Sequence, residues 1–317
     1  MDFKKEILKS SHRISQYVRK TYFQYSFPFS ESFNNDTWFK LENLQHTGSF
    51  KVRGAFNKLL NISKVEKKRG VLSASTGNHG AALAYASQIL GVSCTIYVPK
   101  NASLSKLNNM KQFGAEIKFH GNDCVDAEMK SREMSILQGK TYISPYNDFD
   151  IIMGQGSIGV EIISQVEKPL DVMIISVGGG GLIGGTASYL KYIWPKIHII
   201  GCSPINSAVM LESIEAGEIL DLESKETISD GTAGGVEKDS VTFPICKEVI
   251  DESIFVSETE IKKAMFEYMK KEHQLIEGAA GTAIAALFQK KKYLKGKKVG
   301  VLVCGGNISM ETVKQIL

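Results

Sequence analysis

Short apolar runs rich in β-branched residues recur along the chain and alternate with longer segments of helical pattern. Six of these runs, near residues 70, 93, 115, 171, 197 and 298, predict buried strands. Helices are predicted between several of them, for example in GNHGAALAYASQIL and SLSKLNNMKQFG. Strands that alternate with helices form βαβ units. The pattern therefore predicts an α/β fold with parallel sheets, whose ligands lie beyond the carboxyl ends of the strands.

The apolar alternation also predicts two domains. It restarts at about residue 70 and runs to about 145, where the polar turn SPYNDFD leads into a second series. We expect a small domain of residues 70–146, inserted in a larger domain of residues 1–69 and 147–317. The uncharged run from Val172 to Leu190 is long enough to span a membrane. Its glycines instead favour a strand followed by a tight loop.

Composition and charge argue against several classes of function. The net charge is only +4, from 38 basic and 34 acidic residues, so nucleic acid or an anionic membrane is not an expected partner. The five cysteines are widely spaced and include no C-x-x-C, which argues against a disulfide framework and a zinc site. The charged N-terminal segment lacks the apolar core of a secretory signal. We expect a cytoplasmic protein that acts on a small molecule.

A run of four glycines (Gly178, Gly179, Gly180 and Gly181) lies between a predicted strand and a predicted helix. Glycine lets the backbone approach an anion closely, and the helix N-terminus adds a favourable partial charge. We expect a phosphate here rather than a glycine-packed turn without a ligand. The loop also matches the dinucleotide pattern G-x-G-x-x-G, and a second match begins at Gly154. Ser203 stands where an NAD enzyme usually has an acidic residue, so an NAD(P)-binding oxidoreductase is the less favoured alternative.

A second polar loop, STGNHG at residues 75–80, also lies between a predicted strand and a predicted helix. Its hydroxyls, its amide and its N–H groups suit a carboxylate or an aromatic ring that carries a hydroxyl. The alternative is an ordinary helix start capped by Ser75 or Thr76. His79 could be a catalytic base, but it could equally be a structural histidine.

Three segments in this order, TGSFKVRGA, STGNHG and SVGGGGL, resemble the pyridoxal-phosphate enzymes of the serine/threonine dehydratase and serine racemase family. The resemblance extends from KLENLQHTGSFK through LIEGAAG to VCGGNI, and thus covers almost the whole chain. It implies the tryptophan-synthase β-like fold (fold type II), with two open twisted sheets flanked by helices. The chain looks most similar to the hydroxyectoine-utilisation dehydratases, a threonine-dehydratase-like branch.

The resemblance implies a role for each candidate residue. Lys51 would hold pyridoxal 5'-phosphate as a Schiff base, and its apolar neighbours can supply the desolvation that a reactive amine needs. A solvated surface lysine is the alternative. The other implied cofactor contacts are Phe50 on the ring, Asn78 at its hydroxyl, Gly178 to Gly181 and Leu182 at the phosphate, and Cys304 near the pyridine nitrogen. The implied substrate contacts are Ser75, Thr76, Gly77, His79, Tyr146 and Gly231.

The resemblance implies a deaminating dehydratase, which converts L-threonine or L-serine into a 2-oxo acid and ammonia. Lys51 would remove the α-proton. Thr76 stands where serine racemases carry a catalytic serine, so a serine or aspartate racemase remains an alternative. Others are a dehydratase of a hydroxyectoine-derived substrate or of 3-hydroxyaspartate, and a cofactor-binding protein without turnover. Ser203 and Val209 replace the acidic residues of the racemase metal site, so no metal is expected. A homodimer is expected from the resemblance alone.

Overall fold

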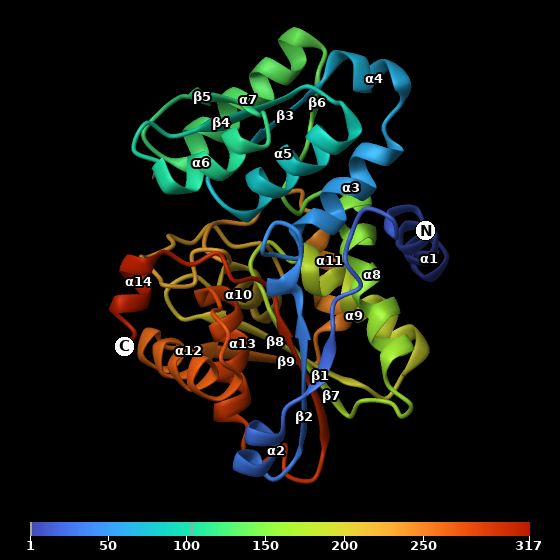
Figure 1. Ribbon diagram of the computed structural model, residues 1–317, viewed down its shortest axis with the longest axis vertical. Helices are drawn as coiled ribbons and strands as arrows, with labels where there is room; N and C mark the ends of the chain where they lie inside the picture. Colours follow the sequence, from blue (N-terminus) through green and yellow to red (C-terminus); the bar gives the residue numbers. More distant parts are fainter. Residues whose placement is uncertain (1, 103) are drawn as a thin grey trace.

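The computed structural model describes residues 2–102 and 104–317 and arranges ten strands of these residues in two sheets (Figure 1). The larger sheet has the order β1 (Phe23–Tyr25), β2 (Asp36–Leu41), β10 (Lys298–Val303), β7 (Val172–Ser176), β8 (His198–Pro204) and β9 (Glu252–Val256). The smaller sheet has the order β5 (Glu116–Phe119), β4 (Cys94–Val98), β3 (Val71–Ala74) and β6 (Thr141–Tyr142). Neighbouring strands are parallel except β1 and β2.

Helices flank both sheets. Four lie around the smaller sheet or near it: α4 (Lys64–Arg69), α5 (Asn78–Leu90), α6 (Leu104–Gln112) and α7 (Cys124–Gln138) (Figure 1). The others are α1 (Phe3–Ile14), α2 (Phe27–Phe33), α3 (Lys51–Asn61), α8 (Phe149–Gln165), α9 (Gly181–Ile193), α10 (Val209–Ala216), α11 (Thr242–Val249), α12 (Glu258–Glu272), α13 (Gly278–Gln289) and α14 (Met310–Lys314), with a 3-10 turn η1 (Glu42–Leu44). The α3 helix lies between the two sheets (Figure 1).

The α/β fold with two sheets flanked by helices is confirmed, and all six predicted strands are present as β3, β4, β5, β7, β8 and β10. The two predicted helices correspond to α5 and α6; Ser103, which begins the second segment, lies outside the described residues. The second dinucleotide match lies inside α8 rather than after a strand. The smaller sheet lies within residues 71–142, and the division into two domains stays a prediction.

The uncharged run from Val172 to Leu190 forms the strand β7, the glycine loop and most of α9. Among the described residues, no helix is both long and apolar enough to cross a membrane.

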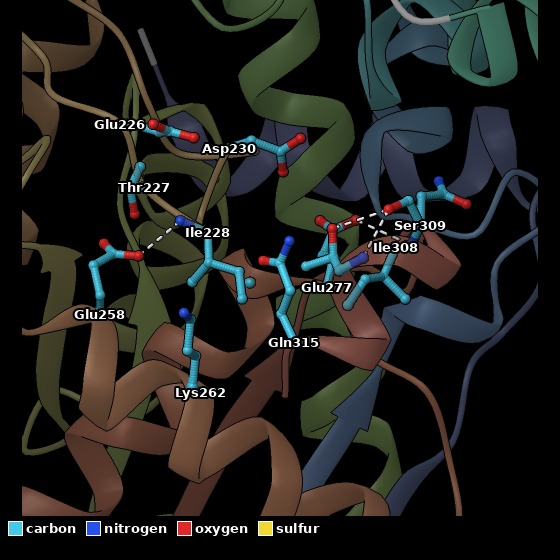
Figure 2. Close-up of a pocket in the computed structure, with 13 residues that line it drawn as sticks. Glu226, Thr227, Ile228, Asp230, Glu258, Lys262, Glu277, Ile308, Ser309 and Gln315 are labelled. Carbon is cyan, nitrogen blue, oxygen red and sulfur yellow. Dashed lines mark hydrogen bonds between the residues drawn. The ribbon is translucent and has the colours of Figure 1, made fainter. Parts of the chain in front are cut away.

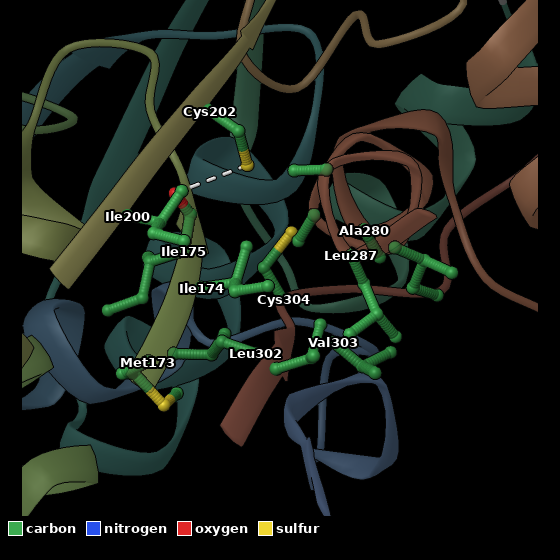
Figure 3. Packing of buried hydrophobic residues seen from close by; sticks show 14 of the residues in the cluster. Met173, Ile174, Ile175, Ile200, Cys202, Ala280, Leu287, Leu302, Val303 and Cys304 are labelled. Carbon is green, nitrogen blue, oxygen red and sulfur yellow. Dashed lines mark hydrogen bonds between the residues drawn. The ribbon is translucent and has the colours of Figure 1, made fainter. Parts of the chain in front are cut away.

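The main hydrophobic core lies on the central strands of the larger sheet (Figure 3). Ile174 and Ile175 on β7, together with Leu302 and Val303 on β10, are fully buried, and Leu287 of α13 packs in the same cluster. A separate core joins the smaller sheet to α3 and α5. Since both faces of the central strands are covered, β7 is apolar up to its last residue and β10 from its second residue on. Their carboxyl ends are therefore held rigidly at one edge of the sheet.

Candidate active site

Chain segments far apart in the sequence meet beyond the carboxyl ends of β7 and β10. These strands are parallel neighbours, so Ser176 at the end of one lies close to Cys304 after the other. The α3 helix begins at Lys51 beside them, and α13 begins at Gly278. One narrow cavity at this place is lined by Phe50, Lys51, Asn78, Tyr146, Ser176, Gly178, Gly179, Gly180, Gly181, Leu182, Gly231, Thr232, Glu277, Ala279 and Cys304.

The Lys51 amine lies in this cavity in a largely apolar position. Its Nζ donates a hydrogen bond to the Pro145 carbonyl oxygen at 2.9 Å and lies 5.2 Å from the centre of the Phe50 ring. Removal of the amine from water lowers its pKa to about 8, and the negative charge of Glu277 opposes this shift. Near neutral pH the unprotonated amine, which can act as a nucleophile or a base, is therefore far more populated for Lys51 than for an ordinary lysine.

The four glycines form a loop that is packed too closely against its neighbours to accept side chains at its first three positions. A Cβ on Gly178 would lie 2.8 Å from the Thr232 carbonyl oxygen, and one on Gly179 would collide with the Tyr146 ring. Gly180 has a φ of 84°, which favours glycine, and a Cβ there would lie 2.5 Å from the Cys246 sulfur. The loop therefore presents backbone at the start of α9, where N–H groups and the helix dipole favour an anion.

A buried carboxylate orients Asn78. The Asn78 amide nitrogen donates to both Glu277 carboxylate oxygens, each at 2.9 Å. The Asn78 side-chain oxygen accepts from the Asn307 amide at 2.6 Å, and the Asn307 backbone N–H donates to Glu277 at 3.1 Å. These bonds fix the direction of the Asn78 side chain. The sequence predictions missed Glu277 and Asn307. The signal for Glu277 was an acidic residue between apolar LI and the small residues GAAG.

Cys304 contributes a neutral thiol to the cavity. Its sulfur is buried, accepts a hydrogen bond from the Ser176 hydroxyl at 3.6 Å and lies 4.0 Å from a Glu277 oxygen. Burial and the charge of Glu277 raise the pKa of Cys304, so the thiol stays protonated at neutral pH.

The second polar loop follows the end of β3, and its residues differ in how far they are exposed to solvent. Ser75, Thr76 and Gly77 are partly exposed, and the Gly77 N–H donates to the Ser75 hydroxyl at 3.2 Å. His79 is buried, and its Nε2 lies 3.1 Å from the Ser73 hydroxyl and 3.2 Å from the Ile143 carbonyl oxygen. Burial and the positive charge of Lys51 lower the pKa of His79 to about 3. These contacts link the neutral imidazole, which α5 carries, to β3 and to the residue after β6.

Tyr146 lines the cavity beside the glycine loop. Its hydroxyl accepts a hydrogen bond from the Glu237 N–H at 3.0 Å, its ring lies against Gly179, and its backbone and Cβ lie beside Gly181. Within residues 2–102 and 104–317, no group of three or more His, Cys, Asp or Glu side chains is arranged to hold a metal ion.

Comparison with known proteins gives consistent results. Residues 14–305 match the family model described as pyridoxal-phosphate dependent enzyme. The L-threonine ammonia-lyase of Thermotoga maritima is 36% identical over 312 residues, which cover 98% of this chain and 77% of that protein. The serine racemase structure of Dictyostelium discoideum has a TM-score of 0.89 at 36% identity and covers 96% of this chain and 98% of that one. The processed threonine deaminase isoform 2 of Solanum lycopersicum has a TM-score of 0.94 at 29% identity, with 99% and 91% covered.

Proposed function

We propose that this chain, which belongs to the pyridoxal-phosphate dependent enzyme family, is an ammonia-lyase of the threonine dehydratase type. It converts L-threonine or L-serine into a 2-oxo acid and ammonia. The observation that carries this proposal is a desolvated Lys51 amine in one cavity with a four-glycine loop. The curated relative named L-threonine ammonia-lyase matches over 98% of the chain and supports the same activity.

The residues of the cavity fit pyridoxal phosphate. Lys51 would hold the cofactor covalently. The loop from Gly178 to Gly181 would hold the phosphate with backbone N–H groups at the start of a helix. A Cβ on any of the first three glycines would collide with neighbouring atoms, so this loop conformation requires glycine there. Asn78 would donate to the ring hydroxyl, Phe50 would pack on the ring, and Cys304 would face its nitrogen. When bound, the cofactor supplies an electron sink that makes the α-proton of an amino acid acidic.

Different residues of the chain then perform different steps of the elimination. Ser75, Thr76 and Gly77 provide hydroxyls and N–H groups for the substrate carboxylate. The unprotonated Lys51 amine removes the α-proton as general base. The neutral Cys304 thiol would give the ring nitrogen of the cofactor no full charge partner, a setting that favours rapid loss of a β-hydroxyl. Tyr146 covers the cavity and helps to exclude water.

A substrate panel tests the proposed activity. The protein reconstituted with pyridoxal phosphate is incubated with L-threonine, L-serine or threo-3-hydroxyaspartate, and 2-oxo acid and ammonia are measured together. We expect equal amounts of both products from L-threonine or L-serine. A preference for 3-hydroxyaspartate would favour that alternative, and absence of product from all three would contradict simple dehydration. A hydroxyectoine-derived substrate would then be tested next.

The glycine loop gives a prediction about cofactor content. The change Gly179→Ala should weaken pyridoxal phosphate binding by about tenfold to a hundredfold, because the new Cβ collides with the Tyr146 ring and forces loop or ring to move. Absorbance of the bound cofactor measures the change. Gly235→Ala is the matched control, since its Cβ would have no atom within 4 Å. Equal cofactor affinity in both variants would argue against the loop as the phosphate site.

The lowered pKa of Lys51 predicts how cofactor attachment depends on pH. Only the neutral amine attacks an aldehyde. The rate of cofactor attachment to apoprotein should therefore rise with pH and level off once the pH exceeds the lowered Lys51 pKa of about 8, whereas an ordinary lysine would need a pH above 10.5. Glu277→Gln should move the midpoint to lower pH, because the carboxylate raises the pKa of Lys51. Stopped-flow absorbance measures the rate, with a free lysine derivative as reference. A midpoint near the reference value would contradict the desolvated amine.

Racemisation remains a second candidate because of Thr76. Its hydroxyl lies at the end of β3, partly exposed, and a serine racemase structure is 36% identical to the chain. If Thr76 serves the opposite face of the substrate, Thr76→Ala should abolish formation of D-amino acid while 2-oxo acid release continues. Chiral chromatography of the products measures both activities. No D-product from the parent protein would end this candidate.

We also propose that the chain acts in the cytoplasm as a homodimer with two domains. The charge balance, the wide spacing of the five cysteines and the likeness to an L-threonine ammonia-lyase support this proposal. Sedimentation analysis of the purified protein tests the dimer.

A further inference from the structure

A second cavity has a volume of about 430 Å³. Figure 2 shows the side chains that line it. Its walls are the segment 226–230, the first turns of α12 and α13, and the C-terminal segment 307–315. Glu277 lines both cavities, and Asp230 of the second cavity precedes Gly231 of the first. The two cavities therefore adjoin. A volume of this size lies within the usual range for a small-molecule site.

Two opposite charges in this second cavity do not pair with each other. Glu258 and Lys262 are four residues apart on α12, a spacing at which such side chains usually interact. Among the described residues, however, Lys262 forms no salt bridge. Glu258 turns one carboxylate oxygen to the Ile228 N–H at 2.8 Å, as Figure 2 shows. The cavity is thus lined by a separate cation and a separate anion.

The other oxygen of Glu258 is buried and has no hydrogen-bond partner among the described residues. A buried carboxylate oxygen without a donor carries an uncompensated desolvation cost. An ammonium group on a ligand could reach this oxygen only after the Glu258 side chain turns toward the cavity, and it would then remove this cost.

The arrangement matches the two charged groups of an α-amino acid. Lys262 can bind the carboxylate, and Glu258 can accept from the ammonium group. Ile228 and Ile308 supply apolar surface for a short aliphatic side chain, and Thr227 and Thr312 supply hydroxyls. Three further carboxylates line the cavity (Glu226, Asp230 and Glu277), so a second carboxylate on the ligand would be repelled.

We propose that this second cavity binds a neutral α-amino acid, which is the substrate itself before it enters the catalytic cavity. The inference rests on the proposed function for the identity of the amino acid. It adds a binding site outside the cofactor pocket, with Lys262 and Glu258 as the residues that recognise the ligand.

Binding to reduced holoenzyme tests the proposal. Borohydride treatment of the cofactor-loaded protein fixes the cofactor to its lysine and prevents exchange with an amino acid, so turnover is blocked. Titration calorimetry with L-threonine should then show binding to the parent protein. Lys262→Ala and Glu258→Gln should each weaken it by about tenfold or more, because each removes one charge-assisted contact. The glutamine in the second variant can still accept from the Ile228 N–H, so folding is preserved.

Lys263→Ala is the matched control. Lys263 is exposed on the same helix and does not line the cavity, so this variant should bind L-threonine like the parent. No binding to the reduced parent, or equal affinity in Lys262→Ala, would overturn the proposal. Failure of the proposed function has a different signature, which is the absence of 2-oxo acid from the unreduced parent.

Discussion

Replacement of Lys51 by alanine is expected to lower 2-oxo acid release from L-threonine by about 10³-fold or more, because one amine serves as cofactor anchor and as general base. The same change should remove the covalently bound chromophore. The fold should survive, since among the described residues the Lys51 amine bonds only to the Pro145 carbonyl oxygen. Coupled measurement of 2-oxo acid release, absorbance of the bound cofactor and thermal unfolding separates the three effects.

Lys64→Ala is the matched control for this prediction. Lys64 lies exposed at the start of α4 and does not line the cavity, so its removal should leave cofactor content and turnover unchanged. Turnover by Lys51→Ala near the parent rate would assign the chemistry to another amine.

Replacement of Arg53 by methionine should lower the free energy of unfolding by about 3 to 5 kcal/mol, because it leaves the buried Glu42 carboxylate without its ion-pair partner. Arg53 lies two residues after Lys51 on α3 and is fully buried. Its guanidinium bonds both oxygens of the buried Glu42 at 2.7 Å and reaches Glu161 of α8 at 2.7 Å. Loss of these bonds would also loosen the start of the helix that carries Lys51. Urea unfolding followed by circular dichroism measures the change.

An exposed arginine provides the comparison for Arg53. Arg132 on α7 pairs with Glu128 and Glu237, but 41% of its side chain is exposed. Arg132→Met should therefore cost about 1 kcal/mol or less. If Arg53→Met were no more harmful than Arg132→Met, the buried network would not be a major source of stability.

The parts of the fold that are visible in the sequence are those set by local pattern. A strand buried on both faces is apolar throughout, so β7 and β10 stand out, and the glycine loop follows directly. Four strands were missed for physical reasons. The edge strands β1 and β9 are only partly buried, and β6 has two residues. In β2 the fully buried Lys40 breaks the apolar pattern, and its charge is accommodated by contacts with Glu161 and Gln165 of α8 and with the Thr21 carbonyl oxygen.

The parts of the candidate site that the sequence does not reveal depend on contacts between distant segments. Asn78 and Glu277 are separated by 199 positions, so nothing local indicates that they bond. The direction of the His79 ring likewise depends on Ile143, 64 positions away. Lys262 and Glu258 lie one helix turn apart on α12. The Glu258 carboxylate accepts a hydrogen bond from the Ile228 N–H and does not pair with Lys262. Such arrangements follow from tertiary packing rather than from a motif.

The attachment of the cofactor to Lys51 is the central claim, and peptide mapping tests it most directly. Protein reconstituted with pyridoxal phosphate is reduced with borohydride, digested and analysed by tandem mass spectrometry. We predict one phosphopyridoxyl group per chain, on Lys51 in the segment TGSFKVR. A modification on another lysine, or an unmodified Lys51 in protein that retains the chromophore, would contradict the account.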